Sequence, residues 1–221
     1  MSRKDALGPA LATVLLLLAL APAVATAAEC PHDGDLVTAL SPPDRRPALL
    51  CAIDTERTAR NLPVVHASAQ LARAAQGHAD DMVTRHFFEH VTPGGSTLGD
   101  RVNATGYITG RRDWDLGEAI AWAQQPLDTP ASLMRAWLGS PEHRAIILDR
   151  RFRDVGVGVT PGLTDGSAEL GATAVLDLGF RTSSPTLPRW RSATACARMA
   201  SKSQRIRARC ASTSTRSKHS N

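Results

Sequence analysis

The first half of the chain shows two amphipathic helical patterns. Residues 47–60 place Leu49 and Ile53 on one side at helical spacing. Residues 68–84 repeat apolar or small side chains at the same spacing, and this pattern puts His78 on the predicted buried side. A histidine in such a place is more often a core residue with satisfied hydrogen bonds than a ligand. We therefore expect two helices here and a structural role for His78.

Two further helices are predicted in the second half of the chain by the same two-residue start signal. Thr129-Pro130 and Ser140-Pro141 each place a capping side chain before a proline, which suits the first position of a helix. The segments 131–138 and 142–148 that follow carry apolar residues at helical spacing. We expect a helix in each segment, which makes four helices in total.

Strands are predicted where apolar and small residues alternate with a period of two. Residues 155–160 and 172–180 alternate in this way and are separated by Gly- and Pro-containing turn signals, so they predict an antiparallel hairpin. A further short strand is expected at 116–122. Four helices followed by such a hairpin indicate an α+β layered domain.

The N-terminal segment has the pattern of an exported leader. Arg3 and Lys4 precede the apolar run 11–21, and Ala25-Thr26-Ala27 follows as a small-residue cleavage site. The run is shorter than the roughly 20 residues needed to cross a bilayer. We expect a signal peptide at 1–27, a secreted, extracellular mature chain and no transmembrane anchor. An uncleaved N-terminal anchor is the alternative.

Export places the four cysteines in an oxidising compartment. Their even number favours two disulfides over a metal site or a thiol nucleophile. Four cysteines allow three pairings, and proximity in sequence favours Cys30–Cys51 and Cys196–Cys210. In the alternative, the second pair stays free or bonds between chains. The expected organisation is a disulfide-linked segment at 28–47, a folded domain at 48–181 and a tail at 182–221.

Charge is concentrated in that tail. The chain has a net charge of +5, and from Arg189 onward it carries nine Arg or Lys residues and no acidic residue. Such a Ser- and Arg-rich segment buries too little apolar area to fold alone, and it suits anionic cell-envelope polymers or lipid headgroups. A solvated tail without a partner is the alternative. Nucleic acid is not expected as a partner, because the chain is exported and its tail offers only Trp190 for stacking.

Polar residues that can carry chemistry interrupt three segments: His90, Glu118 and the pair Glu142-His143. Glu118 lies in an apolar run, where burial is costly unless a cation, a metal or a donor meets the carboxylate. His143 falls in the first turn of its helix, where the dipole favours a neutral imidazole. Two imidazoles and one carboxylate are ligand types that Zn²⁺ accepts. In the alternative, Glu118 bonds backbone amides and His143 bonds Glu118.

Several segments together resemble the bacterial branch of the CAP superfamily, which comprises cysteine-rich secretory proteins, antigen 5 and pathogenesis-related 1 proteins. The similarity spans about 48–181 and keeps the order of the family motifs. These motifs are Leu50-Cys51-Ala52-Ile53-Asp54, Gly77-His78-Ala79-Asp80, Phe87-Phe88-Glu89-His90, Asp100-Arg101-Val102, Gly117-Glu118-Ala119-Ile120, Ser140-Pro141-Glu142-His143-Arg144 and Val155-Gly156-Val157-Gly158.

The resemblance implies a three-layer α-β-α sandwich with a small antiparallel sheet and a central cleft. In this family the cleft holds two histidines and acidic partners, sometimes with a divalent metal such as Zn²⁺ or Mg²⁺. The motif positions place the histidines at His90 and His143 and the first acid at Glu118. The second acid of the family falls near Ser140, so Glu142 either substitutes for it or faces solvent.

The family shares no single reaction, and a fold does not by itself imply a function. The resemblance favours a secreted, non-enzymatic binding domain whose cleft takes a divalent metal and a small lipid-like or anionic ligand. One alternative is a metal-assisted hydrolase acting on peptide or cell-wall substrates, with Glu118 as general base. Another is an extracellular protein–protein interaction module.

Overall fold

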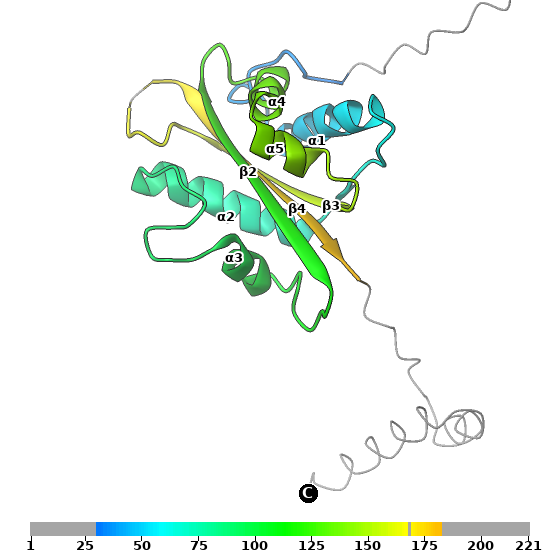
Figure 1. The fold of residues 1–221 in the computed structure, drawn as a ribbon. Coiled ribbons are helices and arrows are strands. Elements are labelled where there is room, and N and C mark those ends of the chain that lie inside the picture. The colour runs from blue at the N-terminus through cyan, green and yellow to red at the C-terminus, as the bar shows by residue number, and fades with distance from the viewer. Residues whose placement is uncertain (1–29, 168, 183–221) are drawn as a thin grey trace, which may run out of the picture.

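The computed structural model describes residues 30–167 and 169–182, and these residues form a single mixed sheet between two layers of helices (Figure 1). The strand order is β1-β3-β4-β2. The strands are β1 (His66–Ala67), β2 (Trp114–Gln124), β3 (Asp154–Pro161) and β4 (Gly171–Arg181). The predicted hairpin is confirmed as β3–β4, and β2 lies antiparallel to β4. The sheet is antiparallel except for β1, which runs parallel to β3.

Within the described residues, five helices surround the sheet, one more than the sequence pattern predicted. They are α1 (Pro42–Thr58), α2 (Ala69–Arg85), α3 (Leu98–Ala104), α4 (Pro130–Gly139) and α5 (Pro141–Ile147). The prediction missed α3 because seven residues give too few turns for a periodic signal. A capping box formed by Thr97 and Asp100 starts this helix instead. The start predicted for α1, at residue 47, was also wrong, since the prolines before it fit the first helical turn.

The helical layers lie on opposite faces of the sheet (Figure 1), which confirms the three-layer α-β-α sandwich. On one face α2 packs so closely on β3 that a Cβ on Gly156 would lie 2.1 Å from the backbone of Leu71. On the other face a Cβ on Gly117 of β2 would lie 2.7 Å from Ile146 of α5. Glycine is therefore required where these two helices approach the strands.

The predicted caps start α4 and α5, and a buried arginine ties α1 to the end of α5. Thr129 and Ser140 accept hydrogen bonds from backbone N–H groups in the first turns of α4 and α5. Arg57 of α1 is fully buried and donates to four backbone carbonyls, among them Ile147 O at 2.6 Å and Phe152 O at 3.3 Å. This side chain ties α1 to the end of α5.

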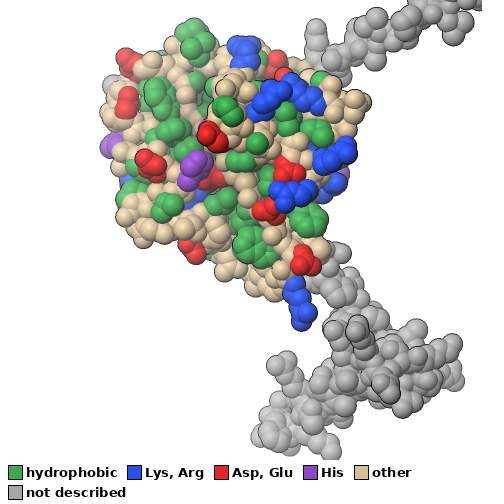
Figure 2. All heavy atoms as spheres, in the orientation of Figure 1, with side chains coloured by type: hydrophobic (Ala, Val, Ile, Leu, Met, Phe, Trp, Pro, Cys, Tyr) green, Lys and Arg blue, Asp and Glu red, His purple; other side chains and the backbone are tan. Residues whose placement is uncertain are grey.

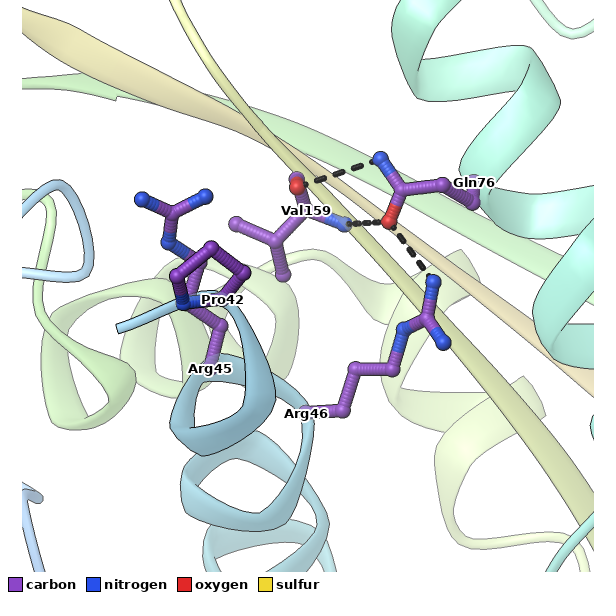
Figure 3. A pocket seen from close by; sticks show the side chains of 5 residues that line it. All are labelled: Pro42, Arg45, Arg46, Gln76 and Val159. Atoms are coloured by element: carbon purple, nitrogen blue, oxygen red, sulfur yellow. Dashed lines mark hydrogen bonds between the residues drawn. The ribbon is translucent and has the colours of Figure 1, made fainter. Parts of the chain in front are cut away.

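Gln76 of α2 covers the outer edge of β3 beyond the short β1. Its Oε1 accepts the N–H of Val159 at 3.2 Å, and its Nε2 donates to the carbonyl of the same residue at 3.2 Å (Figure 3). The side-chain amide thus replaces a neighbouring strand at this position. A cavity of about 220 Å³ lies beside it, between Gln76 and the start of α1.

The Cys30–Cys51 disulfide is confirmed and joins the N-terminal segment to α1. A second cavity, of about 730 Å³, is lined in part by Cys30 and by residues of α1 and α4. None of the helices in the described ranges is long and apolar enough to cross a membrane. The predicted signal peptide, the Cys196–Cys210 pair and the basic tail lie outside the described residues.

Candidate functional site

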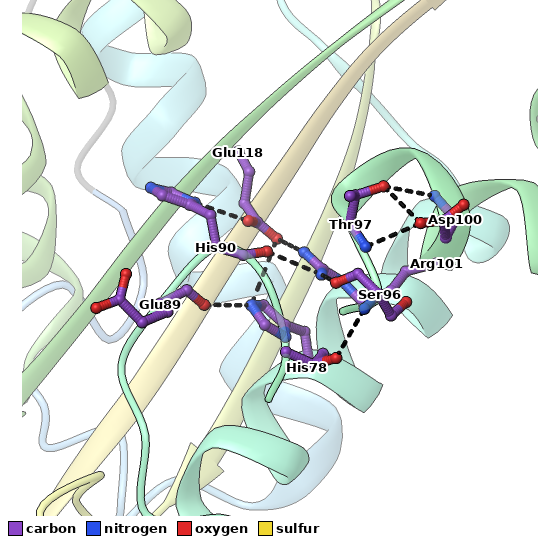
Figure 4. Close-up of polar contacts among 9 residues, drawn as sticks. His78, Glu89, His90, Ser96, Thr97, Asp100, Arg101 and Glu118 are labelled. Atoms are coloured by element: carbon purple, nitrogen blue, oxygen red, sulfur yellow. Dashed lines mark hydrogen bonds and ion pairs between the residues drawn. The ribbon is translucent and has the colours of Figure 1, made fainter. Parts of the chain in front are cut away.

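Glu118 lies on β2 at the centre of a group of polar side chains, and only 5% of this residue is exposed. Its Oε1 accepts a hydrogen bond from His90 Nδ1 at 2.8 Å, and its Oε2 accepts one from Arg101 Nη2 at 2.5 Å (Figure 4). Burial raises the pKa of Glu118, but the hydrogen bond from His90 and the nearby Arg101 and His78 together outweigh burial and hold that pKa below its ordinary value. The alternative in which Glu118 bonds backbone amides and His143 is not what the structure shows.

His90 lies in the segment between α2 and α3, and 53% of its side chain is exposed. The hydrogen bond to Glu118 raises the pKa of His90. Since Nδ1 is engaged by Glu118, Nε2 is the ring nitrogen left to meet a ligand. The exposed apolar side chains of Phe88 and Val91 flank this histidine in the sequence.

His143 approaches the same place from the opposite layer of helices. It lies in the first turn of α5, where its N–H donates to the capping Ser140 Oγ. The ring centroids of His143 and His90 are 6.4 Å apart. Desolvation and the neighbouring His90 lower the pKa of His143, which favours the neutral imidazole expected from the sequence. The two histidines therefore lie close together at β2, an edge strand of the sheet.

Glu142, the candidate second acid, is exposed and accepts a hydrogen bond from Ser140 Oγ at 3.3 Å. Its charge acts on His143 by raising the pKa of that histidine, against the two stronger effects that lower it. On the face of the molecule in view in Figure 2, histidine side chains lie among acidic and apolar ones, while many Lys and Arg side chains gather on the right of the view.

Arg101 was not predicted from the sequence as a site residue, although it lies within one of the family motifs. Besides Glu118, its guanidinium donates to His90 O at 2.9 Å and to Ser96 O at 3.1 Å. The signal that would have found it is the buried carboxylate itself, since a charge in the core requires a counter-charge.

His78 is fully buried in α2, as its place in the helical pattern predicts. Its Nε2 donates to the carbonyl of Glu89 at 3.0 Å and lies 3.9 Å from Glu118 Oε2. Desolvation lowers the pKa of His78, although the charge of Glu118 opposes this. His78 thus holds the chain next to His90 and is itself out of reach of solvent.

Asp177 of β4 was also missed, because a single acid in an alternating strand gives no signal for its partner. It is the cross-strand partner of Glu118 and is fully buried. Neither of its carboxyl oxygens has a hydrogen-bond partner within the described part of the chain. Desolvation, and next the charge of Glu118, raise the pKa of Asp177 well above its ordinary value.

The predicted metal set of His90, His143 and Glu118 stays a prediction. Among residues 30–167 and 169–182, no group of three or more His, Cys, Asp or Glu side chains is arranged to hold a metal ion. Both oxygens of Glu118 already accept hydrogen bonds, so this carboxylate fits the role of an outer partner that orients His90. The donors that remain for a metal are the two imidazoles.

Residues 50–169, more than half of the chain, match the profile of the CAP family, described as the cysteine-rich secretory protein family. The chain belongs to the CAP family. His90, Glu118 and His143 all lie within the matched residues of this CAP domain.

The relatives of this CAP domain are distant. The uncharacterized protein YkwD of Bacillus subtilis (strain 168) is 30% identical over 107 residues, which cover 48% of this chain and 38% of that protein. The uncharacterized membrane protein YlbC of the same organism is 34% identical over 88 residues, covering 40% of this chain and 23% of that protein. The chain thus spans less than two fifths of the length of these curated relatives.

Among solved structures, an outer surface protein from Borrelia burgdorferi matches with a TM-score of 0.53 and 18% sequence identity. The match covers 65% of this chain and 97% of that protein. At this identity the similarity shows the shared fold.

Proposed function

We propose that this CAP domain is a secreted binding domain that holds a divalent metal ion, or a small anionic or lipid-like ligand, between His90 and His143. The observation that carries the proposal is the chain of hydrogen bonds from Arg101 through Glu118 to His90, which orients one imidazole toward the other. Neutral imidazoles are good ligands for Zn²⁺, and the low pKa of His143 favours that form.

The same geometry favours binding over catalysis. Ser140 Oγ serves as a helix cap, so it is not placed as a nucleophile. Both oxygens of Glu118 have donors, so neither is placed as a general base for a bound water. A bound Zn²⁺ would supply Lewis acidity, while the residues of this chain would hold and orient it.

Zinc titration of the full chain by calorimetry, with native mass spectrometry of the loaded protein, tests the proposal. We expect one Zn²⁺ per chain and a loss of at least about tenfold in affinity for His143→Ala, because a ligand imidazole is removed. His66→Ala is the matched control, since His66 is an exposed histidine on β1 outside the site. Zinc binding that survives His143→Ala, or that His66→Ala weakens equally, argues against this site. A co-purified lipid-sized mass without metal would favour the lipid-like ligand.

We further propose that the basic residues from Arg189 onward keep the secreted domain near anionic polymers of the cell envelope. The absence of acidic residues from this stretch supports the idea. Removal of residues 189–221 should release the protein from cells at a salt concentration that retains the full chain. Equal retention of both forms would remove this role.

A further inference from the structure

We propose that Arg101 is a positioning residue that fixes His90 in one orientation and one tautomer, with Nε2 presented to the ligand. The inference rests on the proposed function in that it names how the binding imidazole is prepared. Three contacts of one buried guanidinium carry it.

Arg101 holds the segment that bears His90. Arg101 Nη1 donates to the carbonyls of His90 and Ser96, at 2.9 and 3.1 Å. One side-chain nitrogen therefore holds both ends of residues 90–96. The segment closes on itself as well, since Thr92 N–H donates to Ser96 O at 3.0 Å.

The start of α3 sets the place from which Arg101 acts. Ser96 is followed at once by the capping box of Thr97 and Asp100, which starts α3 and sets the position of the next residue, Arg101. Only 10% of the Arg101 side chain is exposed, so its direction is fixed by packing. The guanidinium points from α3 toward Glu118 and the His90 segment (Figure 4).

The contacts of Glu118 determine the tautomer of His90. Arg101 Nη2 occupies Glu118 Oε2 and leaves Oε1 to His90 Nδ1. A carboxylate that is paired with a guanidinium only accepts hydrogen bonds, so Nδ1 must carry the proton in the neutral ring. Nε2 is then the unprotonated nitrogen and the one that can bind a metal ion.

The geometry also explains why arginine is needed. The two outer nitrogens of the guanidinium bond different groups, Nη1 the two carbonyls and Nη2 the carboxylate. A lysine ammonium is a single point charge, which can neutralise Glu118 but cannot keep the planar arrangement of donors. Arg101→Lys should therefore restore part of the effect and Arg101→Gln none.

The test is the ring ¹⁵N spectrum of His90 in the labelled full chain, recorded without metal at a pH where the ring is neutral. We expect the Nδ1–H tautomer in the unchanged protein, a mixture or the Nε2–H tautomer in Arg101→Gln, and an intermediate result in Arg101→Lys. Arg73→Gln is the matched control, because Arg73 is an exposed arginine of α2 that donates to Thr105 O near α3. Thermal unfolding establishes that each variant is folded.

Zinc affinity of the same variants gives the second measurement. Loss of a partner that orients a metal-binding histidine costs about 10–100-fold in metal affinity, so we expect that loss in Arg101→Gln. An unchanged Nδ1–H tautomer in folded Arg101→Gln overturns the inference, and if that variant does not fold, an unchanged tautomer and affinity in Arg101→Lys overturns it. A shifted tautomer with no zinc binding in any form supports the role of Arg101 and counts against the proposed function.

Discussion

Glu118 of β2 and Asp177 of β4 are direct partners on neighbouring antiparallel strands, and both side chains are buried on the side of the sheet that α2 covers. Two carboxylates so close cannot both ionise easily. Glu118 has His90 and Arg101 as partners, so Glu118 takes the charge. Asp177, which lacks such partners in the described ranges, has the raised pKa of a carboxyl group that keeps its proton.

Replacement of Asp177 by asparagine should change how stability depends on pH. An aspartate in the unfolded chain titrates near about pH 3.9. Above that pH and up to the raised pKa of folded Asp177, the native state binds more protons, so its stability falls as the pH rises. We expect Asp177→Asn to melt higher than the unchanged protein near neutral pH, with the gap narrowing toward about pH 4.

Asp113→Asn is the control for this measurement, since Asp113 is exposed. It should leave the dependence of the melting temperature on pH as it was. A constant gap between Asp177→Asn and the unchanged protein at all pH values would show that Asp177 is ionised in the native state.

His78 should destabilise the fold when the pH falls. Burial lowers its pKa in the native state, whereas an unfolded histidine titrates near about pH 6.5. Between that pH and the lower native pKa, the unfolded chain binds more protons, so stability is lost on acidification. The raised pKa of His90 acts in the opposite sense, because its contribution is complete below pH about 6.5 and is lost as the pH rises.

Melting curves from neutral to mildly acidic pH measure the contribution of His78. We expect a smaller drop in melting temperature for His78→Gln than for the unchanged protein over this range. His66→Gln, at an exposed position, should keep the original slope. If the melting temperature of His78→Gln falls with pH as steeply as that of the unchanged protein, the acid sensitivity has another origin.

Gly156 and Gly77 offer a matched pair of glycine-to-alanine changes. A Cβ at Gly156 would overlap the backbone of α2 at Leu71, so α2 must move off the sheet and take His78 with it. We expect Gly156→Ala to destabilise by about 1–3 kcal/mol or more. Gly77 is exposed in α2 and has nothing within 4 Å of an added Cβ. Gly77→Ala should therefore stabilise by about 0.5–1 kcal/mol.

Urea unfolding of the two variants gives both values under the same conditions. A Gly156→Ala protein as stable as the parent would mean that α2 lies further from β3 than the structure shows. The sign of the stability change in Gly77→Ala depends only on helix propensity, so this variant serves as the control for the method.

Arg57 should be among the most sensitive positions outside the site. Arg57→Met keeps most of the apolar stem but leaves the buried carbonyl of Ile147 and its neighbours without their donor. An unsatisfied buried polar group costs about 1–3 kcal/mol, so we expect a loss of at least about 3 kcal/mol in urea unfolding. Arg60→Met, which removes an exposed pair with Glu56, should cost less than about 1 kcal/mol. Equal losses of stability in Arg57→Met and Arg60→Met would show that Arg57 does not tie α1 to α5.

The local patterns of the chain were sufficient for much of the fold. The caps at Thr129 and Ser140, the alternation that forms β3 and β4, and the buried place of His78 all follow from spacing over a few residues. The short elements β1 and α3 were not predicted, because two and seven residues show too little periodicity. The β2 strand extends beyond its predicted ends because pairing with β4 continues on both sides.

The sequence by itself determined which side chains were available for the site, namely two histidines and one carboxylate in a recognisable order of motifs. Only the tertiary structure decided their partners. His90 and Glu118 are 28 residues apart, and Glu118 and Arg101 are 17 apart. Such contacts depend on how helices and strands pack, which no local period encodes. The burial of Asp177 opposite Glu118 was decided in the same way, by the register of two strands that lie far apart in the chain.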